Sequence, residues 1–403
     1  MNEVSGSGTG VGKVLELLHR QKVEITVLLT SARSRSPRLF FRENVPLPEG
    51  ARLIAPGYVR FGDFFIAPFS LRAWVGMFCR LSRRVGMHTL AFRLTKTLFG
   101  DNINLDQWDL TPLTNGEMRI TARAVKKIAP TAVIANYAFL GPMLCSSVLK
   151  QSKGVVMMHD LLSARVAKFL ENGTPLDCPA ITEAEELSWL QCADFVMAAQ
   201  RTEAELIAPK VRGQVLIQPI LLQVKKGEQQ PEPLRCLFVG TRILPNVTGL
   251  EWFLKEVWPL VLQQEPRAEL HVAGTVCSVV QSDAPSVKML GVVPSLDDET
   301  YRAAVCVVPL LVGSGIKLKL LEALSFSKAC VSTSVGIQGL ELWAPGAIEV
   351  SDEPAGFSAA VLRLMRDPEL RHQREEAAGA LIREHFSVEG RAAREFVAQV
   401  LGQ

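Results

Sequence analysis

The segment best suited to ligand chemistry is Leu311 to Ser325, which reads LVGSGIKLKLLEALS. Gly313 and Gly315 would let the backbone come close to a ligand, and Lys317 and Lys319 add positive charge. If a helix begins after the glycines, its unpaired N–H groups attract anions. The residue types and their order therefore predict a site for a phosphate or diphosphate.

Glu322 lies one helical turn further along this segment. A carboxylate there can accept two hydrogen bonds from a vicinal diol such as a ribose. The segment follows the apolar run Val305 to Val308, so a strand, a glycine loop and a helix occur in the order that a phosphate site requires. The alternative is a surface helix on which Lys319 and Glu322 form a solvent-exposed pair.

A second glycine-rich stretch opens the chain with SGSGTGVGK. It does not match a P-loop, because Ser7 stands at the first glycine and Val14 at the hydroxyl position. The dinucleotide fingerprint also fails, because Lys13 stands at its third glycine. What remains is a loop containing Gly10 and Gly12 that leads into a helix from about Val11 to Arg20, and a flexible terminus is the alternative.

Other polar residues carry weaker signals. His159 follows the apolar run Val155 to Met158, and most histidines at strand ends are structural. Asp297, Asp298 and Glu299 resemble a carboxylate cluster, but after Ser295 they are more typical of a helix start. We therefore expect no metal site and no cofactor.

Apolar runs alternate with helical patterns in the second half, which predicts a doubly wound parallel sheet covered on both faces. These runs are Cys236 to Val239, Leu270 to Ala273, Val287 to Leu290, Val305 to Val308, Ala329 to Ser332 and Ala347 to Val350. The first half repeats the pattern more loosely, with strands expected at Glu24 to Thr30, Arg52 to Ala55, Thr131 to Ala135, Val155 to Met158 and Phe195 to Ala199. We expect two α/β domains, since 403 residues exceed a usual single core.

The polar stretch VKKGEQQPEP marks the boundary between the halves. We predict an N-terminal domain over 1–222, a linker over 223–233 and a C-terminal domain over 234–385. A final helix within 386–403 is expected to cross back onto the first domain.

Composition excludes several classes of protein. The net charge of +3 does not demand a nucleic-acid partner, and no segment of the sequence has the roughly 18 apolar residues that span a bilayer. The eight cysteines form no CxxC pair and indicate reduced core residues in the cytoplasm. Phe64 to Arg84 mixes aromatic residues with arginines, which indicates a peripheral membrane contact or, alternatively, a core helix with a basic face.

The second half resembles the retaining glycosyltransferases of family 4 (glycosyl transferases group 1), which have the GT-B architecture of two facing Rossmann-like domains. The resemblance is carried, in order, by CLFVGTRILPNVTGLEWFLKEVWPLV, ELHVAGT and VKMLGVVPSLDDETYRAAVCVVPLLVGSGIKLKLLEALSFSKACVSTSVGIQGLEL. It covers about residues 234 to 390 well. In the first half it is fainter, through VVMMHDL and EAEELSWLQCADFVMAAQRTEAELI.

The resemblance implies roles for individual residues. Glu322 would bind the donor ribose, Lys317 would act at the reacting phosphate, and His159 would lie near the transferred sugar. The remaining donor-binding positions that it implies are Gly10, Gly12, Gly240, Thr241, Arg242, Gly291, Val292, Val293, Gly313, Gly315, Ile316 and Lys319.

Three features depart from the family pattern. Ser314 stands where many members have a first glutamate, which puts the details of the retaining mechanism in question. Asn246 stands near an expected lysine, for which Lys317 and Lys319 are candidate substitutes. Met1 to Ser5 lacks the apolar residues of the usual first strand, so that strand is expected to be missing, through a start site upstream or a truncated gene model.

These patterns predict a metal-independent glycosyltransferase in glycan biosynthesis that uses a nucleotide-diphosphate sugar and an acceptor. Two alternatives stay open. One is a nucleotide-sugar epimerase or phosphorylase of the same architecture. The other is a non-catalytic subunit that binds nucleotide sugars.

Overall fold

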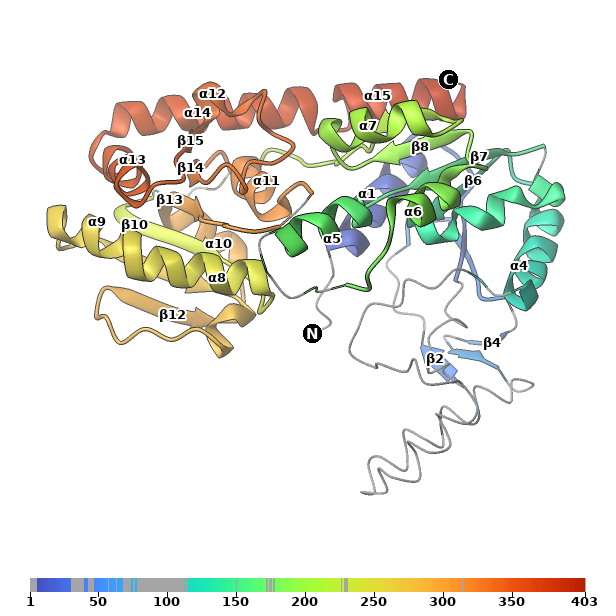
Figure 1. Ribbon diagram of the computed structural model, residues 1–403, viewed down its shortest axis with the longest axis horizontal. Coiled ribbons are helices and arrows are strands. Elements are labelled where there is room, and N and C mark those ends of the chain that lie inside the picture. Colours follow the sequence, from blue (N-terminus) through green and yellow to red (C-terminus); the bar gives the residue numbers. More distant parts are fainter. Residues whose placement is uncertain are drawn as a thin grey trace. The chain divides into compact units, whose positions relative to one another are not determined.

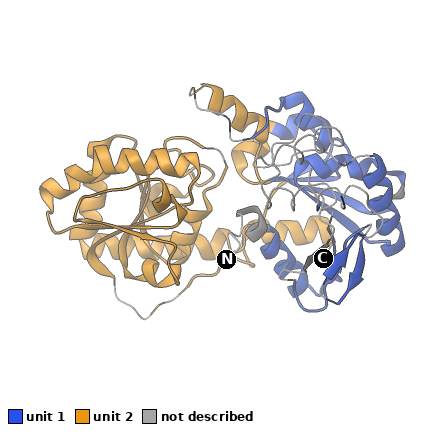
Figure 2. Ribbon diagram, turned by 90° about the horizontal axis from the view of Figure 1, so that it is seen from below, with its two compact units in different colours: residues 1–158, 176–197, 207–215 blue, residues 159–175, 198–206, 216–403 orange. Residues whose placement is uncertain are grey.

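The structure is a computed structural model. It describes residues 6–29, 40–42, 47–56, 58–62, 64–67, 74, 77, 113, 115–149, 151–171, 173, 176, 178–225, 227, 231–313 and 315–402. The chain divides into two compact units (Figure 2). Unit 1 comprises 1–158, 176–197 and 207–215, and unit 2 comprises 159–175, 198–206 and 216–403.

Unit 2 is built on one six-stranded sheet in which every neighbouring pair of strands is parallel (Figure 1). The strand order is β12-β11-β10-β13-β14-β15. The strands are β10 (Glu232–Val239), β11 (Glu269–Ala273), β12 (Val287–Gly291), β13 (Ala303–Val308), β14 (Ala329–Ser332) and β15 (Ile348–Val350).

Helices connect these strands or follow the last of them. They are α8 (Leu244–Trp252), a π-helical turn η5 (Phe253–Val257), α9 (Trp258–Gln264), η6 (Thr275–Ser278), α10 (Leu296–Arg302), α11 (Leu318–Ser325), α12 (Ala344–Ala347), α13 (Pro354–Arg366), α14 (Pro368–His385), α15 (Arg391–Phe396) and η7 (Val397–Leu401). Unit 2 also holds α5 (Leu162–Glu171) and most of α7 (Arg201–Ile207).

The sheet of unit 2 buries both of its faces. Phe238 belongs to one hydrophobic cluster and the adjacent Leu237 to another. In the same way, Val307 belongs to the cluster of Phe238, and the adjacent Cys306 belongs to the cluster of Leu237. Because successive side chains in a strand point to opposite faces, there is one core on each side of the sheet. This explains why the strands read as continuous apolar runs rather than as alternating patterns.

Unit 1 contains smaller sheets. Its main sheet has the order β6-β7-β8-β9, and β6, β7 and β8 are parallel neighbours. These strands are β6 (Ala132–Asn136), β7 (Lys153–Met157), β8 (Phe195–Ala198) and β9 (Gln214–Ile217), of which the last residues of β8 and β9 fall in unit 2. The others are β1 (Thr26–Leu28) with β3 (Arg52–Ile54), and the antiparallel set β2 (Phe40–Arg42), β5 (Phe64–Ile66) and β4 (Val59–Phe61).

The helices of unit 1 are α1 (Gly6–Arg20), α4 (Asn115–Ile128), η2 (Ala138–Cys145), η3 (Ser147–Leu149), α6 (Glu183–Leu190) and η4 (Ala208–Lys210). Among the described residues, no helix is long and apolar enough to cross a membrane.

The structure confirms the predicted α/β class with parallel sheets. Each apolar run of the second half overlaps a strand, and the five strand candidates of the first half overlap β1, β3, β6, β7 and β8. The helix predicted after Ser295 is also present as α10, because the Ser295 side chain accepts a hydrogen bond from the backbone N–H of Asp298 at 3.2 Å.

The predicted glycine loop at Gly10 and Gly12 is wrong, because both residues lie inside α1. The side chains of Val14, Leu17 and Leu18 are buried at helical spacing and hold this helix in place. Once a helix has nucleated, each further residue adds a hydrogen bond, so the helix continues back to Gly6.

The predicted segment Phe64 to Arg84 begins as a strand and not as a helix. Phe64 is exposed and Phe65 is buried, which is the alternation of a strand, and β5 pairs antiparallel with both β2 and β4. Beyond Ala67 this segment lies outside the described residues except for Trp74 and Met77.

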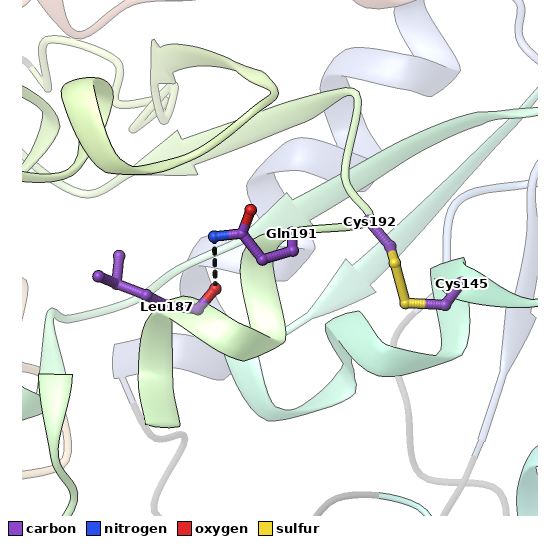
Figure 3. The surroundings of a disulfide bond; sticks show 4 residues. All are labelled: Cys145, Leu187, Gln191 and Cys192. Atoms are coloured by element: carbon purple, nitrogen blue, oxygen red, sulfur yellow. Dashed lines mark hydrogen bonds between the residues drawn. A yellow bond between two sulfur atoms is a disulfide. The ribbon is translucent and has the colours of Figure 1, made fainter. Parts of the chain in front are cut away.

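The prediction that all cysteines are reduced is wrong for one pair, because Cys145 and Cys192 form a disulfide (Figure 3). It joins the end of η2 to the turn between α6 and β8, next to Gln191, whose side-chain amide donates to the carbonyl of Leu187 at 3.3 Å. Such a pairing depends on tertiary contact across 47 residues, which cysteine spacing does not reveal. The free cysteines of the described residues are all buried: Cys178, Cys236, Cys277, Cys306 and Cys330.

A test of this fold is the substitution Gly274→Ala. Gly274 has φ 107° and ψ −178°, a region that only glycine adopts readily, and an added Cβ would lie 2.2 Å from the carbonyl oxygen of Gly240. We expect a loss of about 1–3 kcal/mol from the backbone conformation alone, with the steric clash adding to it. Gly291→Ala is the matched control, because Gly291 also has a positive φ, 67°, but a Cβ there meets nothing within 4 Å. Equal melting temperatures for the two variants would contradict the close approach of β10 and β11.

Candidate functional site

The predicted anion site lies where β13 leads into α11. All six residues of β13 are buried, and the loop after it has φ 137° at Gly313 and 71° at Gly315. These are conformations that favour glycine. Helix α11 begins at Leu318, and the side chain of its N-cap residue Lys317 does not cap it. Its first backbone N–H groups therefore remain suited to a ligand oxygen.

The ammonium group of Lys317 is buried within this loop. Its Nζ donates to the carbonyl of Gly315 at 2.6 Å and to Oε1 of Gln338 at 3.0 Å. Burial lowers the pKa of Lys317 to about 8, although the nearby carboxylate of Asp160 opposes this shift. The side chain is therefore held as a cation that has lost much of its water.

Lys319 is linked to the end of β10. Its Nζ donates to Oδ1 of Asn246 and lies 5.0 Å from the ring centre of Phe238. Asn246 in turn donates to the carbonyl and the hydroxyl of Thr241, at 2.9 and 3.2 Å. Burial, and then the positive charge of Lys317, lower the pKa of Lys319 to about 7. Lys319 thus contacts the very asparagine that replaces the expected lysine.

The carboxyl ends of β10, β11 and β12 meet through backbone contacts. The N–H of Gly274 donates to the carbonyl of Gly291 at 2.7 Å, and the N–H of Val276 donates to that of Gly240 at 3.1 Å. Nearby, the N–H of Arg242 donates to the hydroxyl of Thr275 at 3.0 Å. Ligands of open parallel sheets bind at such carboxyl ends.

Glu322 lies on α11 with an exposed side chain. Partial loss of hydration raises its pKa, while the positive charge of Lys225 opposes that shift. An exposed carboxylate at this place can accept hydrogen bonds from a ligand.

The turn that follows β7 also belongs to unit 2 and lies beside the glycine loop. A Cβ added to Gly315 would be 3.4 Å from Oδ1 of Asp160. Asp160 forms an ion pair with Arg165 at 2.7 Å. Burial lowers the pKa of His159 to about 4, against the opposing charge of Asp160, so the imidazole is neutral near pH 7.

Sequence reasoning did not identify several residues of this cluster. They are Asp160, Arg165, Gln200, Glu203 and Gln338. Gln200 lies beside the loop after β14, because a Cβ on Gly339 would be 2.8 Å from its Oε1. A clue that could have pointed to Asp160 is that it directly follows the candidate residue His159 in the sequence.

The predicted site residues therefore fall into three groups. Gly240, Thr241, Gly315, Lys317 and Lys319 belong to connected contacts within unit 2. Arg242 follows the end of β10, Gly291 ends β12 and is followed by Val292 and Val293, and Gly313 and Ile316 are in the glycine loop itself. Gly10 and Gly12 are in unit 1, and Ser314 lies outside the described residues. Within the described residues, no group of three or more His, Cys, Asp or Glu could hold a metal ion.

Comparison with known proteins agrees with this geometry. Residues 233–367 match the model of the family "Glycosyl transferases group 1". The chain is also 31% identical, over 133 residues, to an uncharacterized 44.6 kDa protein in the cps region of Klebsiella pneumoniae. That alignment covers 30% of this chain and 34% of the relative.

Solved structures with a similar fold include HepE from Anabaena, in complex with UDP and glucose, with a TM-score of 0.59 and 11% identity over 100% of this chain and 97% of HepE. Sucrose-phosphate synthase from Thermosynechococcus elongatus has a TM-score of 0.57 and 14% identity, covering 96% and 90% of the two chains. The fold is that of the GT-B glycosyltransferases. Together with the family match over residues 233–367, it supports a transferase.

The lowered pKa values of the two lysines predict that nucleoside diphosphate binding takes up protons. At pH 8, Lys319 is largely neutral and Lys317 about half charged, and a bound diphosphate favours the charged form of both. We expect net uptake of roughly one to one and a half protons per UDP bound at pH 8, and an affinity that falls as the pH rises through about 7 to 8. Calorimetry at pH 8 in buffers of different ionisation enthalpy measures this uptake.

Lys319→Met should abolish most of that proton uptake, whereas the exposed Lys255→Met should leave it unchanged. Binding of UDP without proton exchange in the parent protein would mean that these lysines do not face the phosphates.

Proposed function

We propose that this protein is a glycosyltransferase that transfers a sugar from a nucleotide-diphosphate sugar to an acceptor, with retention of the anomeric configuration. The observation that carries the proposal is the placement of Lys317 and Lys319 at the start of α11, where the parallel sheet ends. Glu322 lies one turn further along the same helix.

Cleavage of the sugar–phosphate bond leaves negative charge on the diphosphate, which fixed positive groups stabilise. Lys317, Lys319 and the N–H groups of α11 meet that need without a metal ion. The neutral imidazole of His159 is suited to exchange hydrogen bonds with sugar hydroxyls rather than to act as a cation. Ser314, although outside the described residues, stays a candidate contact to the sugar.

Uridine diphosphate is the first nucleotide to test, because the crystal structures of HepE contain UDP. We propose that Glu322 binds the ribose and that Gly291, Val292 and Val293 border the base. The side chain of Val292 is 66% exposed and so offers a free apolar surface there.

We further propose that the protein works in glycan biosynthesis in the cytoplasm.

The contribution of Glu322 is tested by Glu322→Gln. An ionised acceptor forms stronger hydrogen bonds than a neutral one, by about 1–1.5 kcal/mol, so UDP affinity should fall roughly tenfold. The exposed Glu395→Gln serves as the control and should not change affinity. Melting temperatures of both variants should match the parent. An unchanged dissociation constant for UDP in Glu322→Gln would remove the ribose assignment.

We also propose that the protein attaches peripherally to membranes. In the hairpin of β4 and β5, the side chains of Val59, Phe61 and Phe64 are 53%, 78% and 45% exposed. In the sequence, the basic segment comes directly after this hairpin. Aromatic residues settle at the headgroup boundary, and each arginine adds about 1 kcal/mol near an anionic surface.

Co-sedimentation with anionic vesicles is therefore expected at low salt and not at high salt. Changing Arg80, Arg83 and Arg84 to Gln should weaken it, whereas vesicles of neutral lipid should bind little protein. Attachment that is independent of salt, or absent, would refute the proposal.

A further inference from the structure

The side chain of Glu203 is buried on α7, close to the turn that follows β7. It is 4% exposed. Its Oε1 accepts from the side-chain amide of Gln200 at 3.1 Å and, more weakly, from the N–H of Leu161 at 3.4 Å. Its Oε2 is also buried and accepts no hydrogen bond from any described residue. An ionised carboxylate with such an oxygen would be costly, whereas a protonated one can donate from it.

Asp160 is the group that can receive this proton. The carboxyl group of Asp160 is close enough to that of Glu203 for its charge to act on the pKa of Glu203. Arg165 pairs with Asp160 at 2.7 Å, so a positive charge lies beside that carboxyl group. Two adjacent carboxyl groups favour the state in which one of them keeps its proton.

Burial first, and the negative charge of Asp160 second, raise the pKa of Glu203 to about 8. The charged and titratable groups around this pair come from three elements. Arg165 belongs to α5, Lys317 to the loop before α11, and His159 to the turn itself. Near pH 7 this leaves His159 neutral and Glu203 protonated.

We propose that Glu203 is a neutral carboxylic acid that donates its proton to Asp160 and so positions the turn of His159, Asp160 and Leu161 beside the glycine loop. Glu203 accepts from Leu161 and donates to Asp160, and Asp160 lies against Gly315. The proposal rests on the proposed function, because it makes Glu203 a positioning residue for the donor-sugar side of that site. It does not make Glu203 a group that touches the sugar.

Loss of the proton has a defined consequence. Above pH 8 two adjacent carboxylates would repel each other, and of these two links between the turn and α7 only the weak hydrogen bond from Leu161 to Glu203 would remain. Because the pKa of Glu203 is raised on folding, its stabilising effect is complete below about pH 4.5 and is lost as the pH rises through about 8.

The test compares the parent with Glu203→Gln, and with Glu205→Gln as the control on the exposed side of the same helix. The amide of glutamine keeps the shape, donates to Asp160 and accepts from Leu161 at every pH. The melting temperature of Glu203→Gln should therefore rise relative to the parent between pH 5 and pH 9. That of Glu205→Gln should keep a constant difference.

Two further readouts address the proton and its role. Infrared spectra at pH 7 should show the carbonyl stretch of a protonated carboxylic acid that disappears in Glu203→Gln. With saturating UDP-sugar, which keeps the lysines charged, kcat of the parent should fall about tenfold per pH unit above the pKa of Glu203, while Glu203→Gln retains its activity.

Identical pH dependences of stability in parent and Glu203→Gln, together with no infrared signal that is lost on the substitution, would overturn the proposal. So would a kcat ratio between them that does not change with pH. If the protein binds no UDP at all, the proposed function fails, whereas the melting and infrared measurements still decide whether Glu203 holds a proton.

Discussion

The site depends on two ammonium groups that are partly removed from water before any ligand arrives. Lys317 is held by a carbonyl and an amide oxygen, and Lys319 by the oxygen of Asn246. Because desolvated charge is costly, we expect an anion such as a diphosphate to bind favourably beside these lysines. The same loss of hydration lowers the pKa values of both lysines.

The rest of unit 2 makes this arrangement possible. A parallel sheet with a hydrophobic core on each face fixes the ends of β10 and β13, and these carry Thr241 and the glycine loop. Gly274 allows β11 to lie against the backbone of Gly240. The turn after β7 completes the cluster with Asp160, whose charge is opposite to that of the lysines. Positive and negative groups are therefore placed by different elements around one loop.

The sequence was most informative where periodicity and burial coincide. The all-buried strand β13 and the glycine loop after it could be predicted because an apolar run, two glycines and a helical pattern occur in order. The loop predicted at Gly10 and Gly12 is wrong, because the apolar stripe that follows them extends the helix back through both glycines. The Cys145–Cys192 disulfide and the Glu203–Asp160 contact join residues distant in sequence, so neither leaves a local pattern.

The central claim, that the donor nucleotide is held around Lys317, Lys319 and Glu322, is tested most directly by a crystal structure of the protein with UDP. The account predicts diphosphate oxygens within hydrogen-bond distance of both lysine Nζ atoms and the first N–H groups of α11, with the ribose hydroxyls on the carboxylate of Glu322. UDP bound away from α11, or with its ribose remote from Glu322, would contradict it.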